Sequence, residues 1–334
     1  MTDARTDIPS VVQRTRRVEL DAPAVAAHFL GHAAAFVLGE EAVVLASSAG
    51  LRKVDVHGGA ILCSACISAE ILTGGDDGKV MATSADATTR VIASDAKQRW
   101  IDHVASGPNG VIAWSAGKEA FVRGGDGAER MLEVVSTVGG LAFAAKGTRL
   151  AVAHYNGVSL WFPNTQTVPE VLSWRGSHLH TTISPDGRFV VTAMQEPTLH
   201  GWRVADAKDM RMSGYPARVR SFAWTASGKW LATSGSTQLI LWPFQGKDGP
   251  MGKTPQILAP TEHQVEVLAC HPKQEVVAVG YANGMVLLVR LDDGAEVLAR
   301  KPGAAALTAL AWSADGRELA FASDDGDAGI VDLG

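Results

Sequence analysis

The sequence predicts an all-β protein built from small antiparallel sheets that repeat along the chain. The first indication is the stretch from Tyr215 to Phe244, where three short apolar runs are divided by Thr-Ala-Ser-Gly and Ser-Gly-Ser-Thr. Each run alternates or is rich in β-branched and aromatic residues, which is typical of strands, and the Gly, Ser and Thr residues mark turns. A meander of three strands cannot bury both of its faces alone, so it needs neighbouring sheets.

The second indication is internal repetition. Eight positions mark the end of a third strand in successive units: Leu45, Thr83, Val122, Trp161, Trp202, Trp242, Val289 and Val331. The intervals between them are 38, 39, 39, 41, 40, 47 and 42 residues. A period near 40 with three or four short strands in each unit predicts a β-propeller, a ring of sheets around a central channel.

The turns are the third indication. Between first and second strands stand Ser184–Gly187 and Ser313–Gly316, where Pro or Ala precedes Asp-Gly. Between second and third strands stand Gly74–Gly78, Tyr155–Gly157 and Ala282–Gly284, with Asp-Gly or Asn-Gly. Asp-Gly and Asn-Gly are favoured in tight hairpin turns because both residues tolerate positive φ.

Eight third strands predict eight blades of four antiparallel strands, with a ring of seven blades as the alternative. The first unit is the weakest, with a first strand placed at residues 25–30. A strand within residues 11–20 is expected to join the last blade as its outer edge, which closes the ring and removes an exposed sheet edge. Residues 1–10 are expected to be a disordered tail, and residues 11–334 a single propeller domain.

Two phrases carry a resemblance to a known family. Residues 183–193 read I-S-P-D-G-R-F-V-V-T-A and residues 310–326 read L-A-W-S-A-D-G-R-E-L-A-F-A-S-D-D-G. The chain resembles the WD40 repeat family over about residues 15–334. No Trp-Asp dipeptide occurs, because Trp161, Trp202 and Trp242 precede Phe, Arg and Pro. The resemblance implies a propeller that binds a partner protein and catalyses nothing by itself.

The family also carries a buried network of His, Ser or Thr, Asp and Trp side chains. The residues at the position of its Gly-His motif are here His57, Trp174, Tyr215 and Gly303. We therefore expect His57 to be buried and hydrogen-bonded to Asp77 or Thr73, because a buried imidazole without partners would cost about 1–3 kcal/mol. In the other units we expect packing to replace most of the network.

Composition narrows the function classes. The chain has 334 residues, of which 46% are hydrophobic and 19% charged, and its net charge is −5. There is no basic field of the kind that binds nucleic acid. The three cysteines are too few for a disulfide framework, and no signal peptide or membrane span is visible. We expect a cytoplasmic monomer without a cofactor.

Metal and catalytic motifs are incomplete. Cys63 and Cys66 form half a zinc motif with no second half, and we interpret them as small core residues. His178 and His180 place two imidazoles on one strand face, as metal sites do, with Asp102 or Cys63 as a possible third ligand. No complete catalytic constellation is present, so we assign neither catalytic nor metal-binding residues.

The inner strands define the channel. Aligning them places one residue per unit at the same level: Cys63, Asp102, Gly140, His180, Ser221, Val267 and Ala309. Nearly all are small, as a crowded axis requires, and Asp102 and His180 are the ionisable exceptions.

The candidate binding site is the end of the ring where the chain enters each inner strand. Its residues are Trp100, Asp102, Trp174, His178, His180, Arg218, Arg220 and Glu266. Exposed Trp and Arg are common anchors of protein interfaces, so the sequence predicts a protein partner at this end. A small-molecule or metal site at Asp102 and His180 is the alternative, and a propeller hydrolase is a less favoured one.

Overall fold

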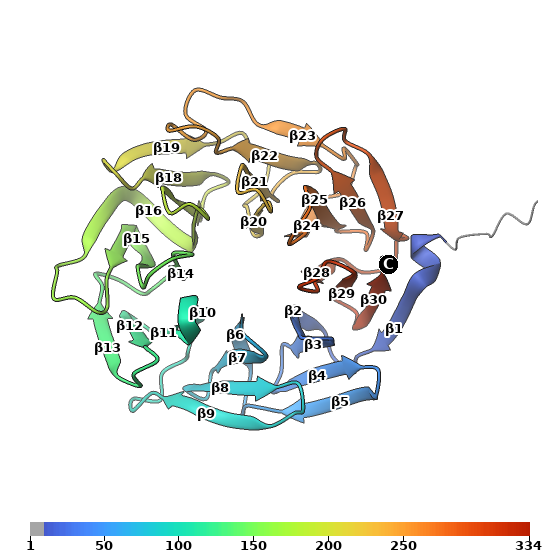
Figure 1. The fold of residues 1–334 in the computed structure, drawn as a ribbon, viewed down its shortest axis with the longest axis horizontal. Coiled ribbons are helices and arrows are strands. Elements are labelled where there is room, and N and C mark those ends of the chain that lie inside the picture. The colour runs from blue at the N-terminus through green and yellow to red at the C-terminus, as the bar shows by residue number, and fades with distance from the viewer. Residues whose placement is uncertain (1–9) are drawn as a thin grey trace, which may run out of the picture.

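The structure, a computed structural model, describes residues 10–334 and is a ring of antiparallel sheets around a central axis (Figure 1). The all-β propeller prediction is correct: apart from two short 3-10 turns, Val11–Arg14 (η1) and Pro108–Gly110 (η2), the regular elements of these residues are strands. The predicted disordered tail lies outside the described residues, except for Ser10.

Six of the sheets have four strands each, and in each of them the strand nearest the axis comes first in the following order. Three of them are β2 (Ala24–Leu30), β3 (Ala33–Leu38), β4 (Ala42–Ser47), β5 (Gly50–Asp55); β6 (Ile61–Ile67), β7 (Glu70–Gly75), β8 (Lys79–Ser84), β9 (Thr89–Ser94); and β10 (His103–Ser106), β11 (Ile112–Ala116), β12 (Glu119–Arg123), β13 (Glu129–Glu133). The other three are β20 (Phe222–Trp224), β21 (Trp230–Thr233), β22 (Leu239–Pro243), β23 (Gln256–Leu258); β24 (Val265–Cys270), β25 (Val276–Tyr281), β26 (Val286–Arg290), β27 (Glu296–Arg300); and β28 (Leu307–Trp312), β29 (Glu318–Ser323), β30 (Asp327–Asp332), β1 (Thr15–Glu19).

The remaining sheet corrects the predicted blade count. It has six strands, β14 (Gly140–Phe143), β15 (Leu150–Trp161), β16 (Glu170–Ile183), β17 (Phe189–Met194), β18 (Leu199–Arg203) and β19 (Lys208–Met212). Over residues 10–334 the ring therefore has seven hydrogen-bonded sheets, so seven blades, and the predicted eight is wrong.

The reason lies in β16. Its first part pairs with β15 and its second part pairs with β17, so the fourth and fifth sequence units share one sheet. Gly176 lies between the two parts with φ of 116°, a backbone conformation that side chains disfavour, and lets the strand turn without a break. The period marks sequence units and cannot show that one strand serves two of them.

The N-terminal strand closes the ring. β1 pairs antiparallel with β30, with Thr15 opposite Val331 and Glu19 opposite Asp327. Figure 1 shows the blue β1 as the outer strand beside the red β29 and β30. Val18 points inward and is buried among Ala24, Ala320 and Ile330. The chain ends thus share a blade, as the sequence predicted.

The core lies between neighbouring sheets. All eight positions that mark the sequence period are buried: Leu45, Thr83, Val122, Trp161, Trp202, Trp242, Val289 and Val331. Aromatic rings fill the space where the six-stranded sheet meets the β20–β23 sheet: the ring centroids of Phe189 in β17 and Phe244 are 5.2 Å apart. The repeat is therefore a packing repeat, since each unit buries its third strand against the next unit.

Buried polar groups tie strands together inside several blades. His57 is 8% exposed, and its ring nitrogens lie 2.9 Å from Asp77 Oδ1 and 2.9 Å from Thr73 Oγ1. Thr83 stands where the family has Trp, and its buried hydroxyl has no partner among the described residues. The network of this unit therefore ends at Thr73.

The β20–β23 blade keeps a fuller network with a different residue. Trp242 Nε1 donates to the hydroxyl of Tyr215 at 2.6 Å, and that hydroxyl lies 2.8 Å from Thr233 Oγ1. Tyr215 occupies the Gly-His position that the sequence assigned to it. The expectation that packing replaces most of the network is therefore wrong for this unit, because a phenol takes the place of the imidazole.

Replacing Tyr215 with Phe is expected to lower the free energy of unfolding by about 1–3 kcal/mol, because the buried Trp242 N–H loses its acceptor. Urea unfolding followed by fluorescence measures the difference. The exposed Tyr155 provides a matched control. Equal stability of Tyr215→Phe and Tyr155→Phe would contradict the role of this network.

Candidate functional site

The channel opens into a cavity of about 510 Å³ at the ends where the inner strands begin. Five of the seven predicted channel positions line it: Cys63, Asp102, Gly140, His180 and Ser221. Arg220 and His103 add two further ionisable groups, and Val25 and Leu62 add apolar surface. We refer to this cavity as the channel mouth.

β-Bulges shape the channel mouth. The register shifts near the first residues of β2, β6, β24 and β28, and near the start of the part of β16 that pairs with β17. Each shift places one extra residue on its strand. A bulge redirects a side chain that regular alternation would bury. Val25 and Leu62 are therefore 51% and 38% exposed, although they belong to apolar strands. Strict alternation along the inner strands does not predict the exposure of either residue.

The bulge in β16 separates two residues that the sequence placed on one face. His178 pairs with Met194 and His180 pairs with the adjacent Ala193, so the residue between the two histidines is the extra one. His180 faces the channel, whereas His178 is only 1% exposed. The expectation that both imidazoles share a face is wrong, because the bulge breaks the alternation.

His178 belongs to the fold. Its Nδ1 lies 2.8 Å from Thr192 Oγ1 and its Nε2 lies 3.0 Å from the carbonyl oxygen of Trp174. It therefore takes the place of the family's histidine in this unit, a role that the sequence alignment gave to Trp174. The indole of Trp174 instead stacks on His200, with ring centroids 4.0 Å apart. The side chain of His178 is not available to a partner at the surface.

The ionisable groups of the channel mouth are His180, Asp102, His103 and Arg220. Partial burial in the channel lowers the pKa of His180, and the positive charges of His103 and Arg218 act in the same direction. Partial burial raises the pKa of Asp102. Arg220 is exposed and no ion pair to it is formed within residues 10–334. A guanidinium with no carboxylate partner is thus open to a ligand.

Two further predicted residues lie next to the channel mouth. The Arg218 guanidinium donates to Gln195 Oε1 at 3.3 Å, which holds it over the hairpin between β17 and β18. Glu266 stands at the bulge of β24 and is half-buried. Neither residue lines the cavity itself.

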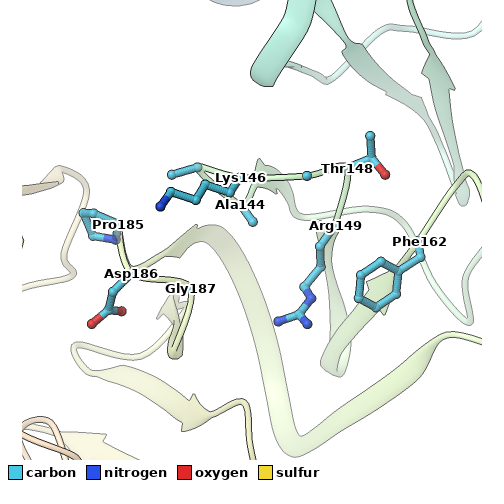
Figure 2. Close-up of a pocket in the computed structure, with 10 residues that line it drawn as sticks. Ala144, Lys146, Thr148, Arg149, Phe162, Pro185, Asp186 and Gly187 are labelled. Carbon is cyan, nitrogen blue, oxygen red and sulfur yellow. The ribbon is translucent and has the colours of Figure 1, made fainter.

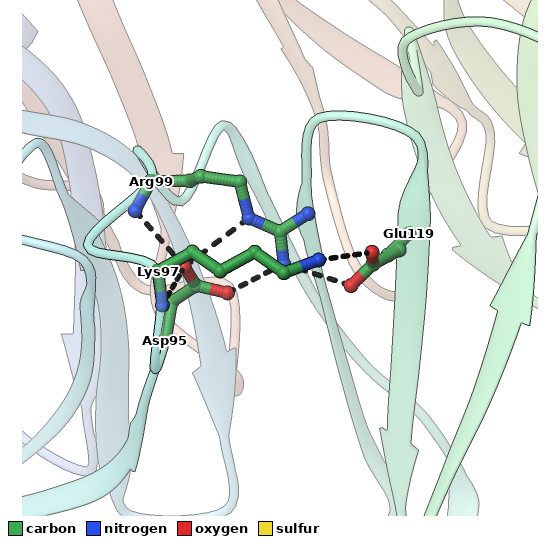
Figure 3. A network of polar contacts seen from close by, with 4 residues as sticks. All are labelled: Asp95, Lys97, Arg99 and Glu119. Carbon is green, nitrogen blue, oxygen red and sulfur yellow. Dashed lines mark hydrogen bonds and ion pairs between the residues drawn. The ribbon is translucent and has the colours of Figure 1, made fainter.

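Trp100 is the most exposed aromatic side chain of the site, at 61%. It follows Arg99, which joins two loops in the polar network of Figure 3. One guanidinium nitrogen of Arg99 donates to Asp95 at 2.6 Å and to Glu119 at 2.8 Å, and Lys97 donates to Glu119 at 3.2 Å. The loop that carries Trp100 is therefore held by an ion pair within the loop and by ion pairs to the next blade.

No metal site forms at these residues. Among residues 10–334, no group of three His, Cys, Asp or Glu side chains is placed to hold a metal ion. Burial raises the pKa of the Cys63 thiol to about 12 and that of Cys66 to about 11. Cys63 Sγ donates to the carbonyl of Ile101 at 3.2 Å. Both cysteines are partly buried and pack against the core, and Cys63 also lines the channel mouth.

The comparisons with known proteins agree with this geometry. The model of the WD domain, G-beta repeat, matches residues 209–243, and the model of the anaphase-promoting complex subunit 4 WD40 domain matches residues 268–334. The chain is a WD40-repeat β-propeller. No curated protein sequence matches it.

Two solved structures have a similar fold at low sequence identity. A chain of the mitotic checkpoint complex crystal structure is 14% identical, with a TM-score of 0.64 over 79% of this propeller and 84% of that chain. The computationally designed Ika8 protein is 16% identical, with a TM-score of 0.74 over 94% of this propeller and 97% of that chain. Both likenesses concern the fold. Across residues 10–334, the propeller has no helix of the length and hydropathy that a bilayer span requires.

Acid is expected to destabilise the propeller through His200. This imidazole is fully buried, and burial lowers its pKa to about 3, with the charges of His178 and Arg211 adding to the effect. Below pH 6.5 the unfolded chain binds a proton at this residue that the folded chain does not, so stability falls as the pH falls. The cost is about 2 kcal/mol at pH 5.

Urea unfolding at pH 7.5 and pH 5 tests this. We expect His200→Phe to lose less stability between the two values than the native chain, whereas His32→Phe, a change at an exposed histidine, behaves like the native chain. The same pH dependence in His200→Phe and the native chain would show that His200 does not cause the loss.

Proposed function

We propose that this WD40 propeller is a non-catalytic scaffold that binds a partner protein at the channel mouth. WD40 propellers are in general non-enzymatic interaction scaffolds. The observation that carries the proposal is the exposed Trp100 on a loop that an ion-pair network holds in place. An aromatic side chain presented in this way loses little conformational freedom on binding, which favours affinity.

The residues in and beside the channel mouth suit a protein interface. Arg218 and Arg220 offer guanidinium groups, Asp102 and Glu266 offer carboxylates, and Val25 and Leu62 offer apolar surface inside the channel mouth. Interfaces combine aromatic and arginine anchors with an apolar centre and a polar rim. Trp174 and His178, whose side chains pack in the blade, support the loops without contacting the partner.

A small molecule is the second candidate ligand for the same cavity. Its volume of about 510 Å³ lies within the range of small-molecule sites, and Asp102 and His180 converge on it. Such a ligand would combine polar groups with apolar surface, because the lining holds Asp102, His180 and Arg220 as well as Val25, Leu62 and Phe222.

The first test is a charge reversal at the channel mouth. Arg218→Glu with Arg220→Glu should abolish capture of the partner from an extract of the native cell, with little change in melting temperature, because exposed charges contribute little to folding. Arg16→Glu with Arg317→Glu is the matched control, since both residues are exposed and the net charge changes equally. Proteins captured by the native chain and the control, but not by the channel-mouth variant, are its partners.

Two outcomes of this test count against the proposal. Undiminished capture by the Arg218→Glu, Arg220→Glu variant would move the site elsewhere on the ring. Equal loss of capture in the control variant would show that net charge, and not the channel mouth, governs binding.

The second test concerns Trp100. Trp100→Ala should weaken binding of the identified partner by about 30-fold, since truncation of an interface tryptophan commonly costs about 2 kcal/mol or more. Glu119→Gln should weaken it less, because it only loosens the loop that presents Trp100. Isothermal titration calorimetry measures both. An unchanged affinity of Trp100→Ala would remove the tryptophan from the interface.

A further inference from the structure

A second cavity, of about 350 Å³, lies at the other end of β14 from the channel mouth, between two neighbouring hairpins (Figure 2). One hairpin joins β14 to β15 and contains Lys146, Thr148 and Arg149, and the other joins β16 to β17 and contains Pro185 and Asp186. The ring of Phe162 forms part of the wall beside Arg149. The proposed scaffold function does not use any of these residues.

Equivalent hairpins recur around the ring, and hydrogen bonds fix their correspondence. The backbone N–H of the first hairpin residue donates to the carbonyl five residues later in each case: Ala144 to Arg149, Ser184 to Phe189, Thr225 to Trp230, His271 to Val276 and Ser313 to Glu318. Arg149 therefore corresponds to Phe189, Trp230, Val276 and Glu318, and it is the cation among these five. A position that elsewhere carries apolar or acidic side chains carries a guanidinium at this pocket.

The turn of this hairpin also differs in its residues from the equivalent turns of two other units. In two other units a serine hydroxyl donates to the turn aspartate, Ser184 to Asp186 at 2.6 Å and Ser313 to Asp315 at 2.7 Å. Here Ala144 and Lys146 occupy those two positions, so the hydroxyl is lost and the charge of the turn is reversed. The altered turn thus points a second cation toward the pocket.

The turn of this hairpin also lacks a backbone hydrogen bond that three equivalent turns have. Gly187, Gly228 and Gly316 donate to the first carbonyl of their turns at 2.7, 2.8 and 2.9 Å. Among the backbone hydrogen bonds of residues 10–334 there is no such bond from Gly147 to Ala144. Gly147 lines the pocket, and its N–H has no backbone acceptor within residues 10–334, so it is free to donate to a ligand.

The two cations have no carboxylate partner within residues 10–334. The guanidinium of Arg149 lies 4.8 Å from the centroid of the Phe162 ring, which holds its plane in position. Asp186, the carboxylate in the lining, is paired with Arg188 at 2.6 Å and turns away from Lys146 in Figure 2. The positive charge of the pocket is therefore not neutralised from within.

We propose that this pocket binds an oxyanion, a phosphate or a carboxylate, between Lys146 and Arg149. A guanidinium fork and an ammonium group match the oxygen atoms of both anions, and backbone N–H groups of an open turn add further donors. The cavity is larger than one phosphate group needs and is of the size of small-ligand sites. The anion therefore belongs to an organic ligand whose body lies against Phe162 and Pro185.

Titration with phenyl phosphate and with benzoate tests the proposal and separates the two anion sources. We expect saturable binding of at least one of them, measured by calorimetry or by chemical-shift changes of the Gly147 amide. Arg149→Gln should weaken that binding about tenfold or more, because charge-assisted hydrogen bonds are the strong ones. Lys146→Asp, which restores the turn residue of the next unit, should weaken it as much or more.

The matched control is Arg317→Gln, an exposed arginine in the equivalent hairpin of the last unit, which should bind like the native chain. Lys146 is exposed, so Lys146→Asp keeps the test valid if Arg149→Gln fails to fold. Absence of saturable binding of both probes, or unchanged binding by Lys146→Asp, would overturn the proposal. These results leave the channel-mouth proposal untouched, because the two sites share no residue.

Discussion

The pairing of β1 with β30 is the constraint on which the rest of this structure depends. A row of blades that pack face to face has two unprotected ends, and only closure into a ring removes them. Five residues of β1 pair with five residues of β30, which joins the start of the described chain to its end across the last blade. Each blade then has a neighbour on both faces, and the buried third strands of the repeat acquire partners all around the ring.

Closure of the ring also restricts where ionisable and aromatic side chains can be presented to a ligand. At the level of Gly140, Ser221 and Ala309 the inner strands carry mostly small side chains, so most of the ionisable and aromatic groups of the two proposed sites lie at the ends of the ring. At one end, bulges shape the channel mouth, which Arg220 lines, and the Arg99 network holds the loop that carries Trp100. At the other end, the hairpin that carries Arg149 has alanine and lysine at the positions where two other hairpins have serine and aspartate. Under the two proposals, the two ends bind different ligands, a partner protein at one and an oxyanion at the other.

Much of the fold follows from the sequence because packing repeats with the chain. Trp161, Trp202 and Trp242 fall at the spacing of third strands, and their burial is what produces that spacing. The number of sheets does not follow, since nothing in the composition of residues 170–183 reveals that β16 joins two units. A period counts units, whereas a sheet is defined by hydrogen bonds that can continue from one unit into the next.

The candidate site is less predictable for a related reason. Bulges depend on how an inner strand pairs with its neighbour. Strict alternation therefore predicted His178 and His180 on one face, and it gave no sign that Val25 and Leu62 would be exposed. His57 is located correctly by the sequence, since its partners Thr73 and Asp77 belong to the same unit. Contacts within a unit can be inferred from a repeat motif, whereas the shape of the channel mouth depends on several units at once.

Hydrogen exchange of the backbone amides in β1 tests the central claim most directly. If the β1–β30 pairing closes the ring, the paired amides of β1 and β30 should be protected to a similar extent as those of the central strands, because their opening requires opening the ring. Rapid exchange throughout Thr15–Glu19, with the central strands still protected, would contradict this account, because the blades would then hold together without the closing strand.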